Sequence, residues 1–363
     1  MTEKTIDILH IADLHLSGSE KEYSLEVLSE IISRADGSRC ILMSGDIFDS
    51  FRDVALLKNE FREITGKFPG EIIYIPGNHE SLGIKKNESL DAFDFGKVRF
   101  SSRIPFDFFT LDFNGIEIEF LTIPHQKDCS SYRQWSLPPK KAPFRIALCH
   151  GNISELIEYT GPGDEEGAES IDSELFHFHG CDYAALGHIH SHRTASYREC
   201  TLAYPGSARV WRKGENGEHG MYRIKIDAAL SSFFEPIQNA GQYHKAVLPV
   251  LFECESTDLP GDWERFQKND FVEIELQGLV EDEKKVPQLE ERIRNQLKKK
   301  VRKLEIDRNK ILPFPGISEV SIVKQFLKEW ESRRPDDASQ YEIWYRSRQI
   351  ALAEIKEILE KRS

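Results

Sequence analysis

The sequence predicts an α/β fold in which two β-sheets are flanked by helices. In its first third, apolar runs of strand length alternate with segments whose apolar residues recur at helical spacing. This strand, helix, strand, helix, strand order is typical of a largely parallel sheet. The middle of the chain then contains more strand-like runs than a plain doubly wound fold has, which favours a second sheet.

Each element is expected from its own run of residues. The first three strands are expected at residues 6–12, 40–44 and 72–75. Helices between them are indicated by two apolar sets at helical spacing, namely Leu25, Leu28, Ile31 and Ile32, and then Val54, Leu57, Phe61 and Ile64. Later strands are expected at residues 116–123, 144–149, 183–186, 201–204 and 221–226. The Gly-rich and acidic stretch at 159–169 predicts a solvated loop.

Length and pattern predict more than one domain. At 363 residues the chain exceeds one average domain, and we expect a catalytic domain over residues 1–240. A smaller α+β unit is expected over residues 241–311, with strands at 247–254 and 271–276 and a helix through Leu289, Ile293, Leu297, Val301 and Leu304. Lysines and arginines between residues 298 and 303 crowd the polar side of that helix.

Two amphipathic helices are predicted in the last segment, residues 312–363. Their apolar positions run from Val320 to Trp330 and from Ile343 to Leu359. The two helices have more apolar surface than they can bury on each other. They would therefore dock either on a partner protein or on the chain's own core.

Composition narrows the class of protein. The six cysteines form no CxxC pair, so neither a disulfide framework nor a zinc knuckle is indicated. The apolar runs are too short to cross a membrane, and the N-terminus lacks the pattern of a signal peptide, so we expect a cytoplasmic protein without membrane contact. A net charge of -13 argues against binding nucleic acid by broad electrostatic attraction.

Five short polar motifs follow strand-like runs and predict a metal site. They are Asp13-Leu14-His15, Gly45-Asp46-Ile47-Phe48-Asp49, Gly77-Asn78-His79-Glu80, His150-Gly151 and Gly187-His188-Ile189-His190. Side chains two residues apart lie on one side of an extended chain, so Asp-x-His and His-x-His can each chelate. The glycines allow tight turns that aim these ligands inward. Carboxylate, imidazole and amide ligands suit Mn²⁺, Fe²⁺ or Zn²⁺.

In this order the motifs resemble those of the calcineurin-like metallophosphoesterase family, over about residues 6–210. The resemblance implies a four-layer αββα sandwich and a dinuclear centre. It further implies that Asp13, His15 and His190 hold one metal ion, that Asn78, His150 and His188 hold the other, and that Asp46 bridges both. Manganese is the expected ion, with Fe²⁺, Zn²⁺ or Mg²⁺ as alternatives.

Within that family, residues 8–16, 44–49 and 203–207 look most like the Mre11/SbcD DNA-repair nucleases. This resemblance implies a DNA exonuclease or endonuclease whose residues 241–311 form a capping, DNA-binding domain. It also implies that residues 312–363 bind a Rad50/SbcC-like ATPase. A homodimer is implied as well, formed through helices near residues 54–64 and 89–95.

His79 is the candidate catalytic residue, because it adjoins the ligand Asn78 and could protonate the leaving oxygen. Many nucleases of that branch have Asp where Glu80 stands, and some have His where Asp49 stands; either residue could orient His79 from outside the metal's ligand set. Two other functions stay open. One is a phosphoesterase of the same fold that acts on a small substrate, such as a cyclic nucleotide or a phosphoprotein. The other is a scaffold that has lost catalysis.

Overall fold

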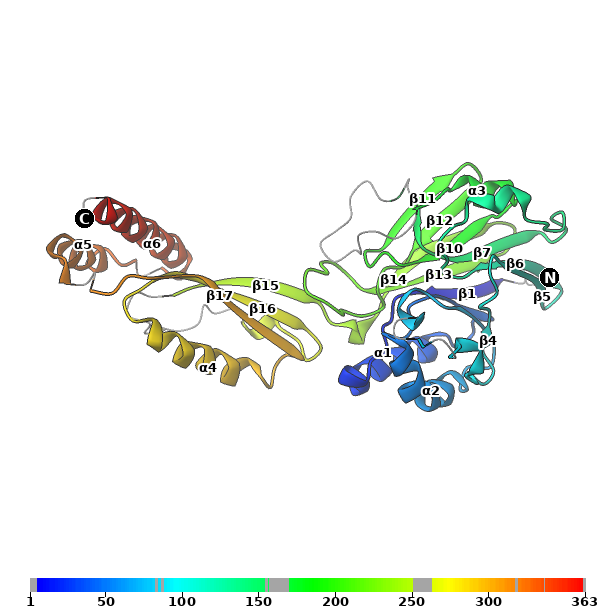
Figure 1. Cartoon of the computed structure of the whole chain (residues 1–363), viewed down its shortest axis with the longest axis horizontal. Helices are drawn as coiled ribbons and strands as arrows, with labels where there is room; N and C mark the ends of the chain where they lie inside the picture. Colours follow the sequence, from blue (N-terminus) through cyan, green and yellow to red (C-terminus); the bar gives the residue numbers. More distant parts are fainter. Residues whose placement is uncertain are drawn as a thin grey trace. The chain divides into compact units, whose positions relative to one another are not determined.

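The chain forms two compact units, residues 1–242 and 243–363 (Figure 1). This computed structural model describes residues 5–81, 84–85, 88–153, 156, 170–250, 263–316, 319–335 and 337–361. The predicted loop at 159–169 lies outside the described residues. The division falls close to the boundary expected at residue 240.

The first sheet of unit 1 contains the predicted parallel strands. β1 (Ile6–Ile11), β2 (Cys40–Ser44) and β3 (Glu71–Ile75) pair in parallel, and α1 (Lys21–Arg34) and α2 (Phe51–Thr65) connect them. The complete strand order is β14-β13-β1-β2-β3-β4, which adds β4 (Arg99–Phe100), β13 (Gly220–Ile226) and β14 (Leu230–Pro236). Because β13 runs antiparallel to β1, the sheet is mixed at that side.

The second sheet contains four of the five later strands expected from the sequence, whereas the run at 221–226 is β13 of the first sheet. Its order is β11-β12-β10-β7-β6-β5, with β5 (Asp107–Phe113), β6 (Ile116–Ile123), β7 (Phe144–His150), β10 (Tyr183–Gly187), β11 (Arg193–Tyr197) and β12 (Cys200–Tyr204). A two-stranded sheet joins β8 (Asn152–Ile153) to β9 (Ser170–Ile171). The helix α3 (Glu174–Phe178) packs through Leu175 and Phe176 on the outer face of the second sheet.

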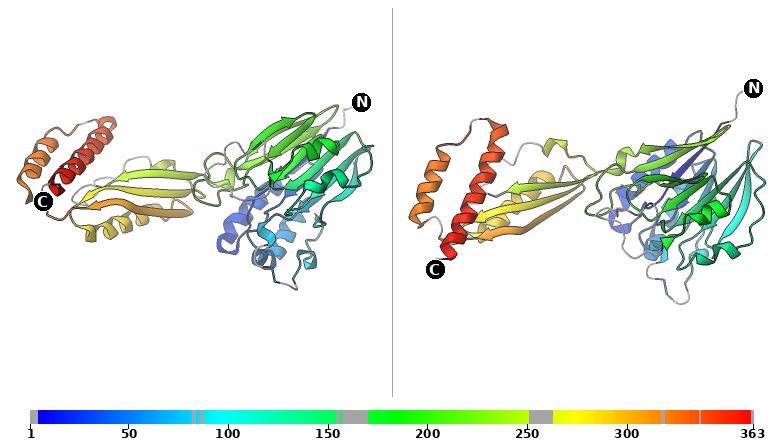
Figure 2. Two further views of the ribbon diagram at one scale, coloured as in Figure 1. Left: turned by 45° about the horizontal axis from the view of Figure 1, so that its top comes forward. Right: turned by 90° about the horizontal axis from the view of Figure 1, so that it is seen from above.

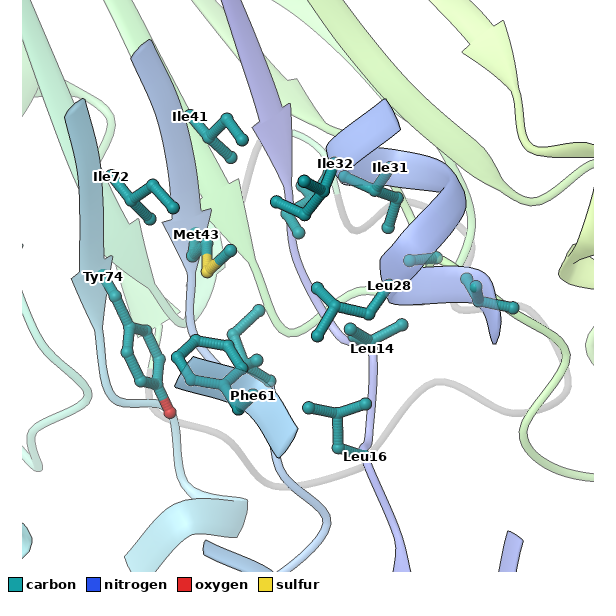
Figure 3. Close-up of a cluster of buried hydrophobic side chains, with 14 of the residues drawn as sticks. Leu14, Leu16, Leu28, Ile31, Ile32, Ile41, Met43, Phe61, Ile72 and Tyr74 are labelled. Carbon is teal, nitrogen blue, oxygen red and sulfur yellow. The ribbon is translucent and has the colours of Figure 1, made fainter. Parts of the chain in front are cut away.

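Alternation along the strands produces the layers, because successive side chains of a strand point to opposite faces. Ile41 and Met43 of β2 face α1 and α2, in the cluster that Figure 3 shows. Cys40 and Leu42 of the same strand face the second sheet. With α3 beyond that sheet, unit 1 is the expected four-layer αββα sandwich.

The second unit is built on three parallel strands. They are β15 (Tyr243–Pro249), β16 (Phe271–Val280) and β17 (Lys303–Pro313), in the order β15-β16-β17. α4 (Val286–Leu297) covers one face of this sheet in both views of Figure 2. Val272, Ile274 and Leu276 of β16 pack there against α4. The first strand begins earlier than predicted, and residues 251–254 lie outside the described residues.

The helix predicted to run from Leu289 to Leu304 is wrong at its C-terminal end. α4 ends at Leu297, and β17 begins at Lys303. Val301 and Leu304 still contribute to the core, but Leu304 does so from a strand paired with Val272. The basic residues from 298 to 303 therefore lie in the connection and at the start of β17.

The C-terminal helices are α5 (Ser321–Glu331) and α6 (Ala338–Glu360). Val323 and Leu352 are buried against Leu279 of β16, so one side of the pair docks on the chain's own sheet. Ile343 and Ile350 of α6 are 70% and 64% exposed, so another side stays open. Within the described residues, no helix combines the length and apolarity that crossing a membrane requires.

Of the two helices expected at a dimer contact, only α2 is present. Residues 89–95 form no α-helix and contain only a short 3-10 turn, Leu90–Ala92. Leu90 and Phe95 are buried in the core beside α2, so their apolar pattern reflects packing within the unit.

Candidate metal centre

All five predicted motifs meet at the carboxyl ends of the strands. Asp13, Asp46 and Asn78 follow β1, β2 and β3 of the first sheet. His150 is the last residue of β7, and His188 directly follows β10, in the second sheet. Since ligand sites of α/β sheets gather where parallel strands end, both sheets supply side chains to one site.

The first group of ligands contains Asp13, His15 and His190. One ligand atom from each lies within 4.8 Å of the others, and all three residues are buried. The Nε2 atoms of His15 and His190 are 3.3 Å apart. Burial lowers the pKa of His15 to about 4, so its imidazole is neutral at pH 7 and can offer a lone pair.

The second group contains Asp46, His150 and His188, again with ligand atoms within 4.8 Å of one another. Asn78 belongs with it, because its Oδ1 lies 3.0 Å from His150 Nε2 and 3.1 Å from His188 Nδ1. The structure therefore brings together all seven predicted ligands in the predicted sets of three, with Asp46 beside the second. That Asp46 bridges both groups stays a prediction.

The surroundings of His150 fit a bound cation. His150 Nδ1 donates to the carbonyl oxygen of Ser44 at 2.8 Å, which leaves Nε2 of the neutral ring as an acceptor. This Nε2 lies 3.4 Å from a carboxylate oxygen of Asp46. Burial alone would lower the pKa of His150, but the Asp46 carboxylate raises it to about 9. A positive charge is therefore favoured between His150 Nε2 and the Asp46 carboxylate, and a metal ion would supply that charge.

The backbone at the ligands is strained. Four predicted ligands have positive φ, at 50° for Asp13, 49° for His15, 51° for Asp46 and 107° for His188. Such conformations cost on the order of 1–3 kcal/mol each and gather at functional sites. They turn the side chains sharply inward as each strand ends.

Two glycines next to ligands are required for different reasons. Gly45 has φ +89°, and a Cβ there would lie 2.2 Å from His150 Nδ1. Gly77 does not have positive φ, but a Cβ there would lie 2.1 Å from Asp46 Oδ1. At Gly77 the requirement is close approach, whereas the sequence suggested conformational freedom.

Glu80 anchors the loop that carries Asp46. Its carboxylate is buried and accepts hydrogen bonds from the backbone N–H groups of Asp46, Ile47 and Phe48, at 3.1, 2.6 and 3.1 Å. It also accepts from the N–H of Gly77 and from the hydroxyl of Tyr74. Glu80 is thus placed to hold two ligand loops together.

Asp49 is the residue that lies beside His79. His79 Nδ1 donates to the Asp49 carbonyl oxygen at 3.0 Å, and the Asp49 carboxylate lies 3.5 Å away. The same carboxylate lies 3.4 Å from His15 Nδ1, and the three side chains form a further group with ligand atoms within 4.8 Å. Asp49 therefore lies close enough to His15, a predicted ligand, to influence how the first group binds a metal ion.

Three residues of the site were not expected from the sequence. Trp211 stacks on His15, with ring centroids 3.8 Å apart and planes at 3°. Glu215 accepts a hydrogen bond from His190 Nδ1 at 2.5 Å. Arg209 is fully buried and donates to the carbonyl oxygens of Leu14 and His15. They lie just after the segment 203–207, the only signal that could have pointed to them.

Comparisons with solved structures give low sequence identity. A purple acid phosphatase, PPD1, from yellow lupin (Lupinus luteus) is 14% identical, with a TM-score of 0.43, and covers 67% of this chain and 53% of that chain. A dimetal phosphatase from Danio rerio is 10% identical, with a TM-score of 0.44, and covers 64% of this chain and 96% of that chain.

Two sequence comparisons each match part of the chain. The Bacillus subtilis (strain 168) protein named "Uncharacterized metallophosphoesterase YhaO" is 25% identical over 260 residues, or 61% of this chain. The match spans only 57% of that protein's length. The family model described as "Calcineurin-like phosphoesterase" matches residues 6–192. That range includes all seven predicted ligands.

Proposed function

This chain belongs to the calcineurin-like phosphoesterase family, and we propose that it is a dinuclear phosphodiesterase whose substrate is DNA. The family assignment supports a metal-dependent hydrolase of phosphoester bonds. The observation that carries the proposal is the convergence of the seven predicted ligands with His79 beside them. The ligand set is complete, which speaks against a scaffold that has lost catalysis.

Two bound divalent cations would supply a metal-activated hydroxide and neutralise the phosphate oxygens. The chain's own part is to hold and move a proton. The His79 ring lies edge-on to His15, with ring centroids 4.6 Å apart. Nδ1 of His79 donates to the Asp49 carbonyl, so Nε2 is the nitrogen that would give a proton to the leaving oxygen, and it carries that proton when the ring is in its imidazolium form.

DNA as substrate is supported by the second unit and by the motifs that resemble the Mre11/SbcD branch. A parallel sheet with α4 follows the phosphoesterase sandwich, and Lys298, Lys299 and Lys300 are exposed directly after that helix. These lysines could contact phosphates despite the acidic net charge. We assign residues 241–311 the capping, DNA-binding role and expect Mn²⁺ as the metal.

We also propose that the open side of α5 and α6 binds an ATPase of the Rad50/SbcC type. Ile322, Ile343 and Ile350 are more than half exposed, although Val323 and Leu352 are buried on the chain's own sheet. A pull-down with and without residues 312–363 tests this, and truncation should abolish capture. The homodimer implied by the resemblance would use α2, whose Leu56 is 55% exposed.

The nuclease proposal is tested with labelled duplex and single-stranded DNA in Mn²⁺, beside a p-nitrophenyl phosphodiester. We expect His79→Ala to keep its metal content and to lose about 10²–10⁴-fold in turnover. His177→Ala, a histidine of α3 outside the site, is the control and should keep full activity.

Turnover of the small diester with inert DNA would favour the small-substrate phosphoesterase instead. Failure of the purified protein to hold two metal ions would favour the scaffold. Loss of metal together with activity in His79→Ala would contradict the role given to His79.

A further inference from the structure

The two groups of predicted metal ligands differ in the hydrogen-bond acceptor at Nδ1 of a histidine, which is a carboxylate for His190 and a carbonyl for His150. His190 Nδ1 donates to the carboxylate of Glu215 at 2.5 Å, and both side chains are about 97% buried or more. His150 Nδ1 donates to a neutral carbonyl oxygen, that of Ser44. A carboxylate behind an imidazole makes that imidazole a stronger metal ligand than a carbonyl does.

Glu215 is itself held by the turn in which it lies. Its second carboxylate oxygen accepts hydrogen bonds from the backbone N–H groups of Trp211 and Arg212, at 2.7 and 3.2 Å. The orientation of Glu215 is thus fixed from two sides.

The same turn covers the other histidine of the first group. The Trp211 indole stacks flat on the His15 ring, and the Arg212 guanidinium lies 4.8 Å from the indole centroid. Trp211 also lies 5.5 Å from His190 and 5.2 Å from His79, measured between ring centroids. One turn, residues 211–215, therefore fixes His190 by a hydrogen bond and His15 by stacking, and the contacts described for the second group include no such turn.

We propose that the turn at residues 211–215 makes the Asp13, His15 and His190 position the tighter of the two, so that divalent cations bind in sequence. Glu215 is then a positioning residue, which acts through His190. The inference rests on the metal pair of the proposed function but not on its substrate. Loss of such outer partners of a metal ligand costs about 10–100-fold in metal affinity.

Glu215→Gln is a sharp test because an amide cannot replace both roles of the carboxylate. If the Gln NH₂ faces His190, Nδ1 must accept, and the neutral ring then carries its proton on Nε2, the ligating atom. If the Gln oxygen faces His190 instead, its NH₂ meets the N–H groups of Trp211 and Arg212. Either arrangement weakens the first position and leaves the second untouched.

The experiment titrates the chelator-treated full-length protein with Mn²⁺ and follows heat by calorimetry and indole fluorescence. For the wild type we expect two binding steps. Glu215→Gln should weaken the tighter step about 10–100-fold and leave the weaker one unchanged. Asn78→Ala should remove the weaker step alone. Glu119→Gln, which changes a buried carboxylate paired with Arg145 away from the site, is the matched control and should change neither.

A single class of equal sites in the wild type would overturn the proposal, as would unchanged binding in a folded Glu215→Gln. Circular dichroism of each metal-free variant checks folding. If Glu215→Gln does not fold, Trp211→Ala takes its place and must weaken the tighter step. A protein that binds in sequence but does not cut DNA would refute only the proposed substrate.

Discussion

Glu80→Gln is expected to destabilise the metal-free protein, because one carboxylate satisfies five donors at the centre of the site. One oxygen accepts from the N–H groups of Asp46 and Gly77. The other accepts from the N–H groups of Ile47 and Phe48 and from the Tyr74 hydroxyl. Glutamine has one acceptor oxygen and a donor NH₂, so at least two buried N–H groups would face another donor.

The size of this loss follows from the number of donors left unsatisfied. A buried donor without a partner costs about 1–3 kcal/mol, so two of them give about 2–6 kcal/mol. This is a large fraction of the roughly 5–15 kcal/mol that stabilises a typical native domain. Because the loop at Asp46 would also shift, the second group of ligands should bind metal more weakly.

Urea unfolding in the presence of a chelator, followed by circular dichroism, measures this free energy. Glu117→Gln is the control, since Glu117 is exposed on β6 and should change stability by no more than about 0.5 kcal/mol. A loss of less than 1 kcal/mol in Glu80→Gln would refute the anchoring role.

Two further changes test the packing around the site. Gly77→Ala should displace Asp46, because the new Cβ would lie 2.1 Å from its Oδ1, and metal analysis should show fewer than two ions per chain; a full metal pair would contradict this. For His10, burial lowers the pKa to about 3 from 6.5, so the unfolded chain binds the proton first and stability is lost as pH falls below 6.5. Between pH 8 and 5 the wild type should lose about 2 kcal/mol more than His10→Gln in urea unfolding, and equal losses would contradict it.

The sequence predicted two sheets flanked by helices because the signals of these elements are local. Strand β2 shows this, since residues 40–44 are apolar throughout and the structure buries both faces of the strand, one on the helices and one on the second sheet. A ligand such as Asp46 could be identified in the same way, because it directly follows such a strand. Local patterns of this kind need no knowledge of distant residues.

The end of α4 could not be predicted by the same means. Val301 and Leu304 continue the helical spacing of Leu289, Ile293 and Leu297, so periodicity alone extends the helix. In the structure Leu304 pairs with Val272 in β16, and both remain against the same core. The hydrogen bonds that favour a strand at Leu304 are made with β16, and β16 lies outside the stretch of sequence from which the helix was predicted.

The sequence alone thus pointed to the seven predicted ligands, since strand ends and a period of two bring them to one edge, and their division into two groups came from the family resemblance. Only the tertiary structure decided what supports them. Glu80 reaches residues 46–48, and Glu215 reaches His190 across 25 positions of the chain. Such contacts depend on which turns, distant in the sequence, lie side by side in the fold. Neither the spacing of residues nor the composition predicts this.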